Sequence, residues 1–180
     1  MARVLVLSLG ALWFIVGPKP LTRNTLEREG RCMTFPIYRR ASEADLPAVV
    51  RLEEHYMREL EPKNLAQWCA SEAAVHGLLA SNQVRMFVSQ LGGEIVGYGY
   101  WGLKKETPHI YNLYVYPDYR RYGIAKDLLE RVEADIVKAG FSRCTYCPVS
   151  THPARTFIEQ AGFELMRDDG ERLHMVRELG

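Results

Sequence analysis

A β-rich run from Tyr111 to Val115 leads through a Pro-Asp turn into the strongest amphipathic helix of the chain, and no other feature constrains the fold as much. The helix is expected to begin around Tyr122 and to end at Gly140, because glycine is common at helix C-termini. Its apolar positions follow three- and four-residue spacing and are Ala125, Leu128, Leu129, Val132 and Ile136. One face of this helix must therefore pack against a sheet that contains the preceding strand.

From Pro36 onwards, the rest of the pattern alternates between strand-like and helix-like stretches. A Gly92-Gly93 turn between two β-rich runs indicates a hairpin, and Ser42 with an acidic residue three positions later is typical of a helix start. Strands are expected at 37–40, 84–90, 94–101, 109–116, 143–149, 164–167 and 172–177, and helices at 45–60, 64–79, 122–139 and 153–161. This order predicts a mixed α/β fold in which helices flank a mostly antiparallel, twisted sheet.

Composition narrows the class of protein. The chain has 180 residues and a formal net charge of +1, without a basic cluster, which argues against nucleic acid as a partner. Its four cysteines do not form a disulfide framework, so a reducing cytoplasm is the simpler expectation. Cys144 and Cys147 form a C-x-x-C pair, but no second ligand pair follows at zinc-binding spacing. We therefore expect no metal and place the two cysteines on opposite faces of a strand.

The N-terminal segment 1–32 differs from the regular pattern of residues 33–180, which we expect to form one domain. Residues 4–16 are largely apolar, in a run that is short for a transmembrane helix and lacks a small-x-small cleavage site after it. Three interpretations stay open: an upstream start assignment with the true start at Met33, a membrane-associated anchor, or a cleaved signal.

The junction between the strand and the helix has the features of an anion site. Free N–H groups of a first helical turn point outward, and the helix dipole is positive there, so a pair of phosphates can be held by the backbone. Gly123 allows close approach and Ala125 adds little bulk, while Arg120 and Arg121 supply nearby charge or are simply solvated. The segment Arg120-Arg121-Tyr122-Gly123-Ile124-Ala125-Lys126 is the candidate loop.

The run from Leu113 through Ala125 closely resembles the acetyl-CoA signature of the GCN5-related N-acetyltransferases. Arg120, Gly123 and Ala125 match the pyrophosphate-loop positions of that family. The stretch 153–163, which includes Arg155 and ends in Gly-Phe, is similar to the helix and turn that complete the CoA side. The resemblance covers about residues 37–177 and implies the acyl-CoA N-acyltransferase fold with acetyl-CoA as co-substrate.

The same resemblance implies a mechanism. The pantetheine arm would pair like an extra strand with the edge of the strand at 109–116, next to Leu113, Tyr114 and Val115. A main-chain N–H near Leu113 would polarise the thioester carbonyl. The acceptor, a small-molecule amine or a protein amino group, would attack directly in a ternary complex.

Two positions depart from the family pattern. His152 stands where an Asn often precedes the last helix, and Ile158 stands where a Tyr often protonates the leaving thiolate. Tyr146 and Tyr114 are candidates to protonate the thiolate instead, only because they lie in neighbouring segments of the pattern. A CoA-binding module of this fold with little or no turnover is therefore the alternative function, and a zinc or redox protein built on the C-x-x-C pair is an alternative from another class.

His109 lies where some family members place a catalytic Glu, and histidine titrates near neutrality, so it is the candidate base. It could equally be an ordinary residue at the start of a strand. Glu94, Glu106, His152 and bulk water are the other candidates. His55, His76 and His174 have no motif context and are expected on surfaces or partly buried faces.

The acceptor is expected between the first two helices and the far end of the sheet. The candidate walls are Glu53, Glu54, Tyr56, Tyr100 and Trp101. Acidic residues there would favour a cationic amine, although Glu53 and Glu54 are also the expected solvated face of the first helix. Homodimers are common in the family, and the terminal strands offer an interface.

Overall fold

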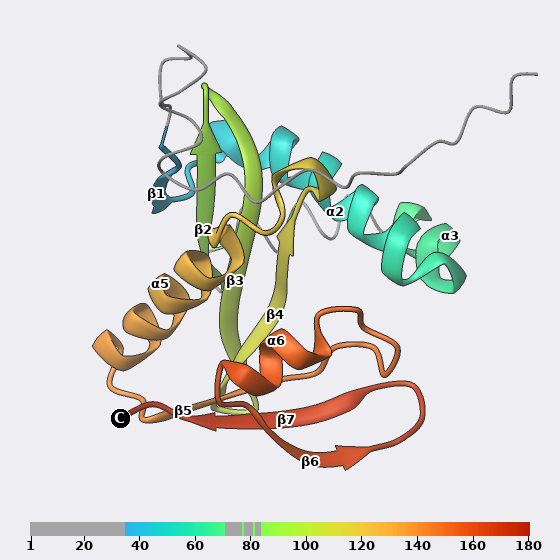
Figure 1. Ribbon diagram of the computed structural model, residues 1–180, viewed down its shortest axis with the longest axis vertical. Helices are drawn as coiled ribbons and strands as arrows, with labels where there is room; N and C mark the ends of the chain where they lie inside the picture. Colours follow the sequence, from blue (N-terminus) through green and yellow to red (C-terminus); the bar gives the residue numbers. More distant parts are fainter. Residues whose placement is uncertain (1–34, 71–76, 78–80, 82–83) are drawn as a thin grey trace, which may run out of the picture. The chain divides into compact units, whose positions relative to one another are not determined.

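The computed structural model describes residues 35–70, 77, 81 and 84–180. By contacts the chain separates into Met1–Arg31 and Cys32–Gly180, and all elements below belong to the second unit (Figure 1). The elements are β1 (Ile37–Arg40), η2 (Glu43–Asp45), α2 (Leu46–Leu60), η3 (Pro62–Asn64), α3 (Leu65–Ala70), β2 (Val84–Leu91), β3 (Glu94–Lys104), β4 (Thr107–Val115), η4 (Pro117–Tyr119), α5 (Ile124–Lys138), β5 (Arg143–Tyr146), α6 (Arg155–Gln160), β6 (Glu164–Asp168) and β7 (Leu173–Glu178).

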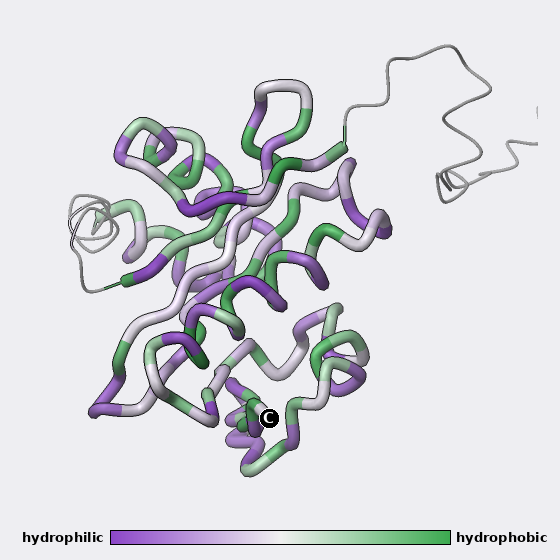
Figure 2. The backbone as a smooth tube through the Cα atoms, turned by 90° about the vertical axis from the view of Figure 1, so that its left-hand side faces the viewer, coloured by the Kyte–Doolittle hydropathy of each residue, from purple (hydrophilic) through white to green (hydrophobic). Residues whose placement is uncertain are grey.

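Seven strands form one sheet in the order β1-β2-β3-β4-β5-β7-β6. Every neighbouring pair is antiparallel except β4 and β5, which are parallel. The predicted mixed, mostly antiparallel sheet with flanking helices is confirmed. Figure 2 shows hydrophobic and hydrophilic residues alternating along the helices, as expected for elements with one buried face.

β3 explains why α2 and α5 cover opposite faces of the sheet. Tyr98 and Tyr100 pack into the cluster that contains the buried side of α2. The alternate residues Gly97 and Gly99 face α5, where a Cβ on Gly99 would lie 3.4 Å from Val132 Cγ2. Successive residues of a strand point to opposite faces, so bulky tyrosines fill one side while glycines let α5 approach closely on the other.

Gly99→Val is expected to lower the free energy of unfolding by about 1–3 kcal/mol, because the added Cβ would lie 2.9 Å from Leu113 Cδ1 and overpack the interface with α5. Urea denaturation at neutral pH measures the loss. Gly99→Ala adds only the Cβ and should lose less. Native stability in both variants would contradict the close approach of helix and strand.

The first helix starts as predicted but buries a residue that the sequence placed outside. The Ser42 N–H and hydroxyl both donate to Asp45 Oδ2 at 2.8 Å, at the start of η2. Glu53 was expected on the solvated face, and that expectation is wrong because its side chain is only 4% exposed. It lies one turn from the buried Val49 and Tyr56, on the same stripe of α2.

The other expected elements are present with shifted ends. The hairpin around Gly92-Gly93 is confirmed as β2 and β3. The strand predicted at 143–149 ends earlier, at Tyr146, and Val149 makes only an isolated bridge to Arg172. Of the helix predicted at 64–79, α3 is seen, whereas Val75, His76, Leu78 and Leu79 lie outside the described residues. So do residues 1–32 and Met33, and their interpretation stays a prediction.

Within the described ranges, no helix is long and apolar enough to cross a membrane. The run 4–16, which the sequence offers as a membrane anchor, is not among those ranges.

Candidate functional site

The site is built on an open edge of β4. Parallel pairing with β5 covers only His109 with Thr145 and Ile110 with Tyr146, and the strands then diverge. β4 carries a bulge at this point, because Tyr100 pairs with Asn112 and Trp101 with Ile110. Among the strands that the structure describes, none pairs with the part of β4 that follows on the β5 side.

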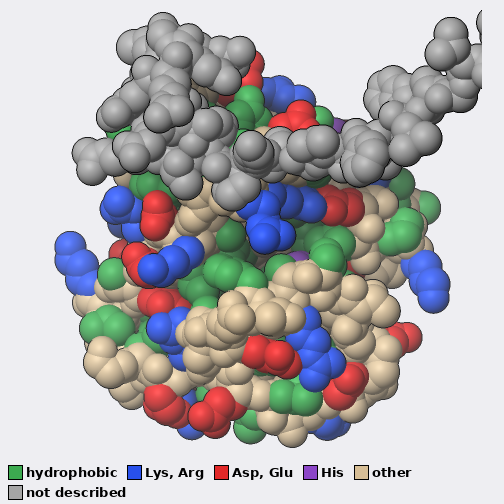
Figure 3. Space-filling model, viewed as in Figure 1, with side chains coloured by type: hydrophobic (Ala, Val, Ile, Leu, Met, Phe, Trp, Pro, Cys, Tyr) green, Lys and Arg blue, Asp and Glu red, His purple; other side chains and the backbone are tan. Residues whose placement is uncertain are grey.

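A cavity of about 630 Å³ runs along this edge, between the start of α5 and α6. Its lining residues are Glu59, Leu60, Leu113, Tyr114, Val115, Tyr119, Arg120, Arg121, Gly123, Ile124, Ala125, Lys126, Tyr146, His152, Pro153, Ala154, Thr156, Phe157, Ile158 and Gln160. Figure 3 shows a recess on this face with hydrophobic side chains in its floor and Lys and Arg side chains beside it. An apolar channel with a cationic rim suits a long ligand that carries negative charge at one end.

The backbone at the rim presents free donors. Arg121 and Gly123 adopt positive φ values of 70° and 83°, and α5 begins at the next residue, Ile124. The first N–H of this turn with a helical acceptor is that of Asp127, which donates to Gly123 O at 3.0 Å. The preceding N–H groups lie at the positive end of a 15-residue helix, so they can hold an anion.

Arg120 joins this loop to β4 and to α2. Its guanidinium makes two bonds to Glu59, of 2.7 and 2.6 Å, and its Nε donates to Val115 O at 2.8 Å. It also lies 5.2 Å above the Tyr114 ring. The positive charge of Arg120, which the sequence offered for an anionic ligand, is thus already paired with Glu59 of α2. Arg121 and Lys126 are exposed at the rim.

The N–H of Leu113, the predicted thioester contact, takes part in a network of polar side chains next to the β4 bulge. Its N–H donates to Asn112 Oδ1 at 2.9 Å, and Asn112 Nδ2 donates to Glu53 Oε2 at 3.2 Å and to the Tyr98 hydroxyl at 3.0 Å. Burial raises the pKa of Glu53 to about 7, against the opposing effect of hydrogen bonding with Tyr100, Tyr98 and Asn112. A ligand that takes the Leu113 N–H must therefore displace the Asn112 side chain.

His152 lines the cavity in a defined tautomer. Its Nδ1 accepts the Ala154 N–H at 3.1 Å, so the ring proton is on Nε2, which has no partner among the described residues. Burial lowers the pKa of His152 to about 4, so the ring is neutral at pH 7. Its Nε2–H is a neutral donor that is buried from solvent.

The inner end of the cavity contains Tyr146 and Ile158, both buried. Within the described part of the chain, the Tyr146 hydroxyl has no hydrogen-bond partner, whereas the Tyr114 hydroxyl donates to Glu59 Oε2 at 2.7 Å. Burial raises the pKa of Tyr146, with a smaller opposing effect from Arg172, so its hydroxyl stays protonated at neutral pH.

Three predicted site residues do not line the cavity: His109, Tyr122 and Arg155. Arg155 forms an ion pair with Glu159, one turn along α6, at 2.8 Å. Glu94 and Glu106 are exposed and also lie outside the lining. Of the candidate acceptor walls, Tyr100 faces α2, while Trp101 points to the opposite face and donates to Asp135 at 2.9 Å.

His109 is buried and faces β5. The Thr145 hydroxyl donates to Pro108 O at 3.2 Å, so it accepts the His109 Nδ1–H at 2.9 Å and leaves Nε2 unprotonated. Burial, with smaller effects from Lys104 and His174, lowers the pKa of His109 to about 4.

Sequence reasoning missed Glu59, which bonds both Arg120 and Tyr114. The contact joins residues 61 apart in the chain, and no local pattern identifies it. Among the described residues no group of three or more His, Cys, Asp or Glu side chains is arranged to hold a metal, and Cys69, Cys144 and Cys147 are free.

Comparisons with known proteins agree with this geometry. The profile of the family described as "Acetyltransferase (GNAT) domain" matches residues 53–176. No curated protein matches the chain.

Solved structures share the fold. The PaiA N-acetyltransferase from Thermoplasma acidophilum, in complex with coenzyme A, is 16% identical with a TM-score of 0.69, over 80% of this chain and 99% of that one. YncA from Salmonella typhimurium, with its cofactor acetyl-CoA, is 19% identical with a TM-score of 0.62, over 81% and 95%. The ribosomal-protein-S18-alanine N-acetyltransferase from Escherichia coli is 18% identical with a TM-score of 0.61, over 81% and 95%.

The resemblance read from the sequence is thereby confirmed. Since the family profile spans more than half of its length, the chain belongs to the GCN5-related N-acetyltransferase (GNAT) family.

Proposed function

We propose that this protein transfers the acetyl group of acetyl-CoA to a primary amine, by direct attack of the amine in a ternary complex. The observation that carries the proposal is the cavity along the unpaired edge of β4. Its rim is a helix N-terminus with free N–H groups, and its inner end holds the Tyr146 hydroxyl, which has no hydrogen-bond partner among the described residues. Two of the similar structures contain coenzyme A or acetyl-CoA, which supports the same ligand for this cavity.

The proposed cofactor placement follows from the donors. The diphosphate lies at the N–H groups of residues 123–126, and the exposed side chains of Arg121 and Lys126 stand beside it. The pantetheine arm follows β4 and takes the Leu113 N–H from Asn112. The thioester then lies at the point where β4 and β5 diverge, next to Tyr146.

Proton transfer can be assigned to two groups. His109 Nε2 is unprotonated and is the proposed base, acting on an amine that arrives on the α2 face of the sheet. Tyr146 replaces the family's tyrosine, whose position is filled here by Ile158, and protonates the departing thiolate.

Tyr146→Phe is expected to lower kcat about 10- to 100-fold while KM for acetyl-CoA stays within about threefold, because the lost hydroxyl acts only when the thiolate leaves. Steady-state kinetics with thiol detection measure both constants. Tyr114→Phe removes a hydroxyl that is already bound to Glu59 and should lower kcat less. Equal loss in the two variants would rule out the assignment to Tyr146.

The test of the function is a screen of small amines and peptide N-termini with the full chain, with free CoA as the readout. Acceptor-dependent release of CoA, together with thermal stabilisation by acetyl-CoA, is the expected result. No stabilisation at saturating acetyl-CoA would contradict the proposal. Stabilisation without CoA release for any amine would favour the alternative that Ile158 raises, a CoA-binding module with little turnover. A homodimer through the terminal strands stays a prediction.

A further inference from the structure

We propose that Cys147, His174 and Asp169 form a second acyl-accepting site, at which the thiol of Cys147 takes the acetyl group from a thioester held at the inner end of the cavity. The proposal rests on the proposed function, because that function brings acetyl-CoA to this point. It adds a covalent S-acetyl-cysteine that direct transfer to an amine does not require.

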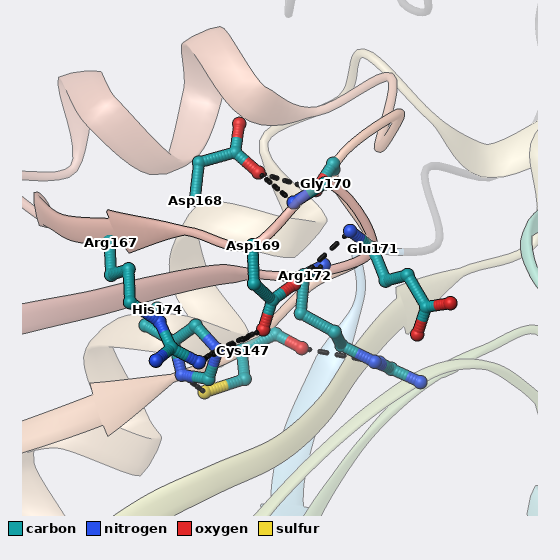
Figure 4. A network of polar contacts seen from close by, with 9 residues as sticks. Cys147, Arg167, Asp168, Asp169, Gly170, Glu171, Arg172 and His174 are labelled. Atoms are coloured by element: carbon teal, nitrogen blue, oxygen red, sulfur yellow. Dashed lines mark hydrogen bonds and ion pairs between the residues drawn. The ribbon is translucent and has the colours of Figure 1, made fainter.

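The three side chains form a hydrogen-bonded chain (Figure 4). Cys147 Sγ lies 3.6 Å from His174 Nδ1, and His174 Nε2 lies 2.7 Å from Asp169 Oδ2. The other oxygen of Asp169 accepts the N–H groups of Glu171 and Arg172, at 3.1 and 2.7 Å, so the turn between β6 and β7 fixes the carboxylate. Nucleophile, base and orienting carboxylate thus stand in the order that activates a thiol.

The charges define the direction of proton transfer. Hydrogen bonds from His174 first, and then from the backbone, hold the pKa of Asp169 well below its usual range. The ionised carboxylate accepts the His174 Nε2–H, so Nδ1 is left to accept the Cys147 S–H. Arg167 Nη2 also contacts Asp169 Oδ2, at 3.3 Å, and lies 3.5 Å from His174 Nε2, so its positive charge stands beside both groups.

Cys147 rests as a thiol. Burial raises its pKa, and the opposing charges of Lys104 and Arg172 lower it by less. The Arg172 side chain also donates to Cys147 O at 3.2 Å, which fixes the backbone beside the sulfur. His174 therefore has to remove the proton as the sulfur attacks, as in other thiol–imidazole pairs.

The thiol lies outside the lining of the cavity, one residue beyond Tyr146 at its inner end. The β4–β5 pairing ends at Tyr146, which lines the cavity, and Cys147 is the next residue. β7 pairs Met175 with Tyr146, so the antiparallel register sets His174 opposite Cys147. His174 and Asp169 keep about a third of their side-chain surface exposed, so a substrate can reach the group.

The other described cysteines lack these features. Cys144 is fully buried in the core, and burial raises the pKa of its thiol to about 12. Cys69 is exposed on α3, with no histidine bonded to its sulfur among the residues that the structure describes.

The reaction needs no further reagent. The Cys147 sulfur attacks the thioester carbonyl while His174 takes the thiol proton. The bond from the carbonyl carbon to the CoA sulfur then breaks, and His174 returns the proton to the departing thiolate. One thioester replaces another, so an amine can still remove the acetyl group from Cys147.

The test is incubation of the full chain with acetyl-CoA in the absence of an amine, followed by intact-protein and peptide mass spectrometry. We expect one acetyl group on Cys147, removed by neutral hydroxylamine. Cys147→Ser should abolish the adduct, and Cys69→Ser should not change it. Asp169→Asn keeps the oxygen that caps the turn and should slow acetylation about tenfold. No adduct on Cys147 in a chain that acetyl-CoA stabilises thermally would overturn the proposal.

A second probe separates this proposal from the proposed function. S-acetyl-N-acetylcysteamine is a small thioester without a diphosphate, so it does not depend on the loop before α5. Acetylation of Cys147 by this probe, in a chain that shows no stabilisation by acetyl-CoA, would support the thiol site and contradict the proposed function. Acetylation of Cys69 as fast as Cys147 would overturn the thiol site. A third outcome would also overturn the thiol site: loss of amine-dependent CoA release in His174→Asn but not in Cys147→Ser. His174 would then act on the amine itself and not through Cys147.

Discussion

Replacing Gly123 with valine is expected to weaken acetyl-CoA binding about 10- to 100-fold, which corresponds to about 1.4–2.8 kcal/mol. Gly123 lines the rim of the cavity at φ 83°, where a Cβ would meet no protein atom within 4 Å. The valine side chain would therefore stand in the open space proposed for the diphosphate, above the free N–H groups of α5. Isothermal titration of the full chain with acetyl-CoA measures the change in Kd.

The other end of the same helix supplies the matched control. Gly140 has φ 93°, a Cβ there would likewise meet no protein atom within 4 Å, and the residue does not line the cavity. Both valine variants should lose about 1–3 kcal/mol of unfolding free energy from backbone strain. Only Gly123→Val should lose affinity, and equal Kd values in the two variants would contradict a diphosphate site at this turn.

The cofactor loop could be predicted from the sequence because its determinants are local. A strand, a turn and an amphipathic helix within residues 107–138 fix where free N–H groups point, whatever the rest of the chain does. Gly123 and Ala125 then mark the position within that turn, and both line the cavity. The hairpin at Gly92-Gly93 was predictable for the same reason.

The polar contacts that complete the site are non-local. Glu59 bonds Arg120 across 61 positions, and Cys147 meets His174 across 27, through a strand register that no periodicity reveals. His174 was expected on a surface or a partly buried face because it has no motif context. The burial of Glu53 was also mispredicted, because a carboxylate is normally solvated and its partners Tyr98, Tyr100 and Asn112 are distant in the sequence.

Glu53→Gln is expected to make the protein more stable above pH 7, by up to about 3 kcal/mol, and to change its stability little near pH 5. Burial raises the pKa of Glu53 to about 7 from an ordinary value of 4.5. Between these two values the folded chain binds the proton more tightly than the unfolded chain. The free energy of unfolding therefore falls as pH rises through this window, and the loss is complete above pH 7. Glutamine has no proton to lose and can still accept the Asn112 N–H through its carbonyl oxygen.

Urea denaturation of the native chain and of Glu53→Gln at pH 5 and pH 8 measures the difference. Glu133 has its pKa raised to about 7 by burial as well, against the charge of Arg177, so part of the decline should remain in the variant. Adding Glu133→Gln to the Glu53→Gln variant should remove that remaining part, and Glu133→Gln alone serves as the matched control. Destabilisation of Glu53→Gln by the same amount at both pH values would mean that Glu53 is a charged, well-paired carboxylate. The Asn112 side chain would then be held on the Leu113 N–H by a permanent charge, and acetyl-CoA would have to break that contact at every pH.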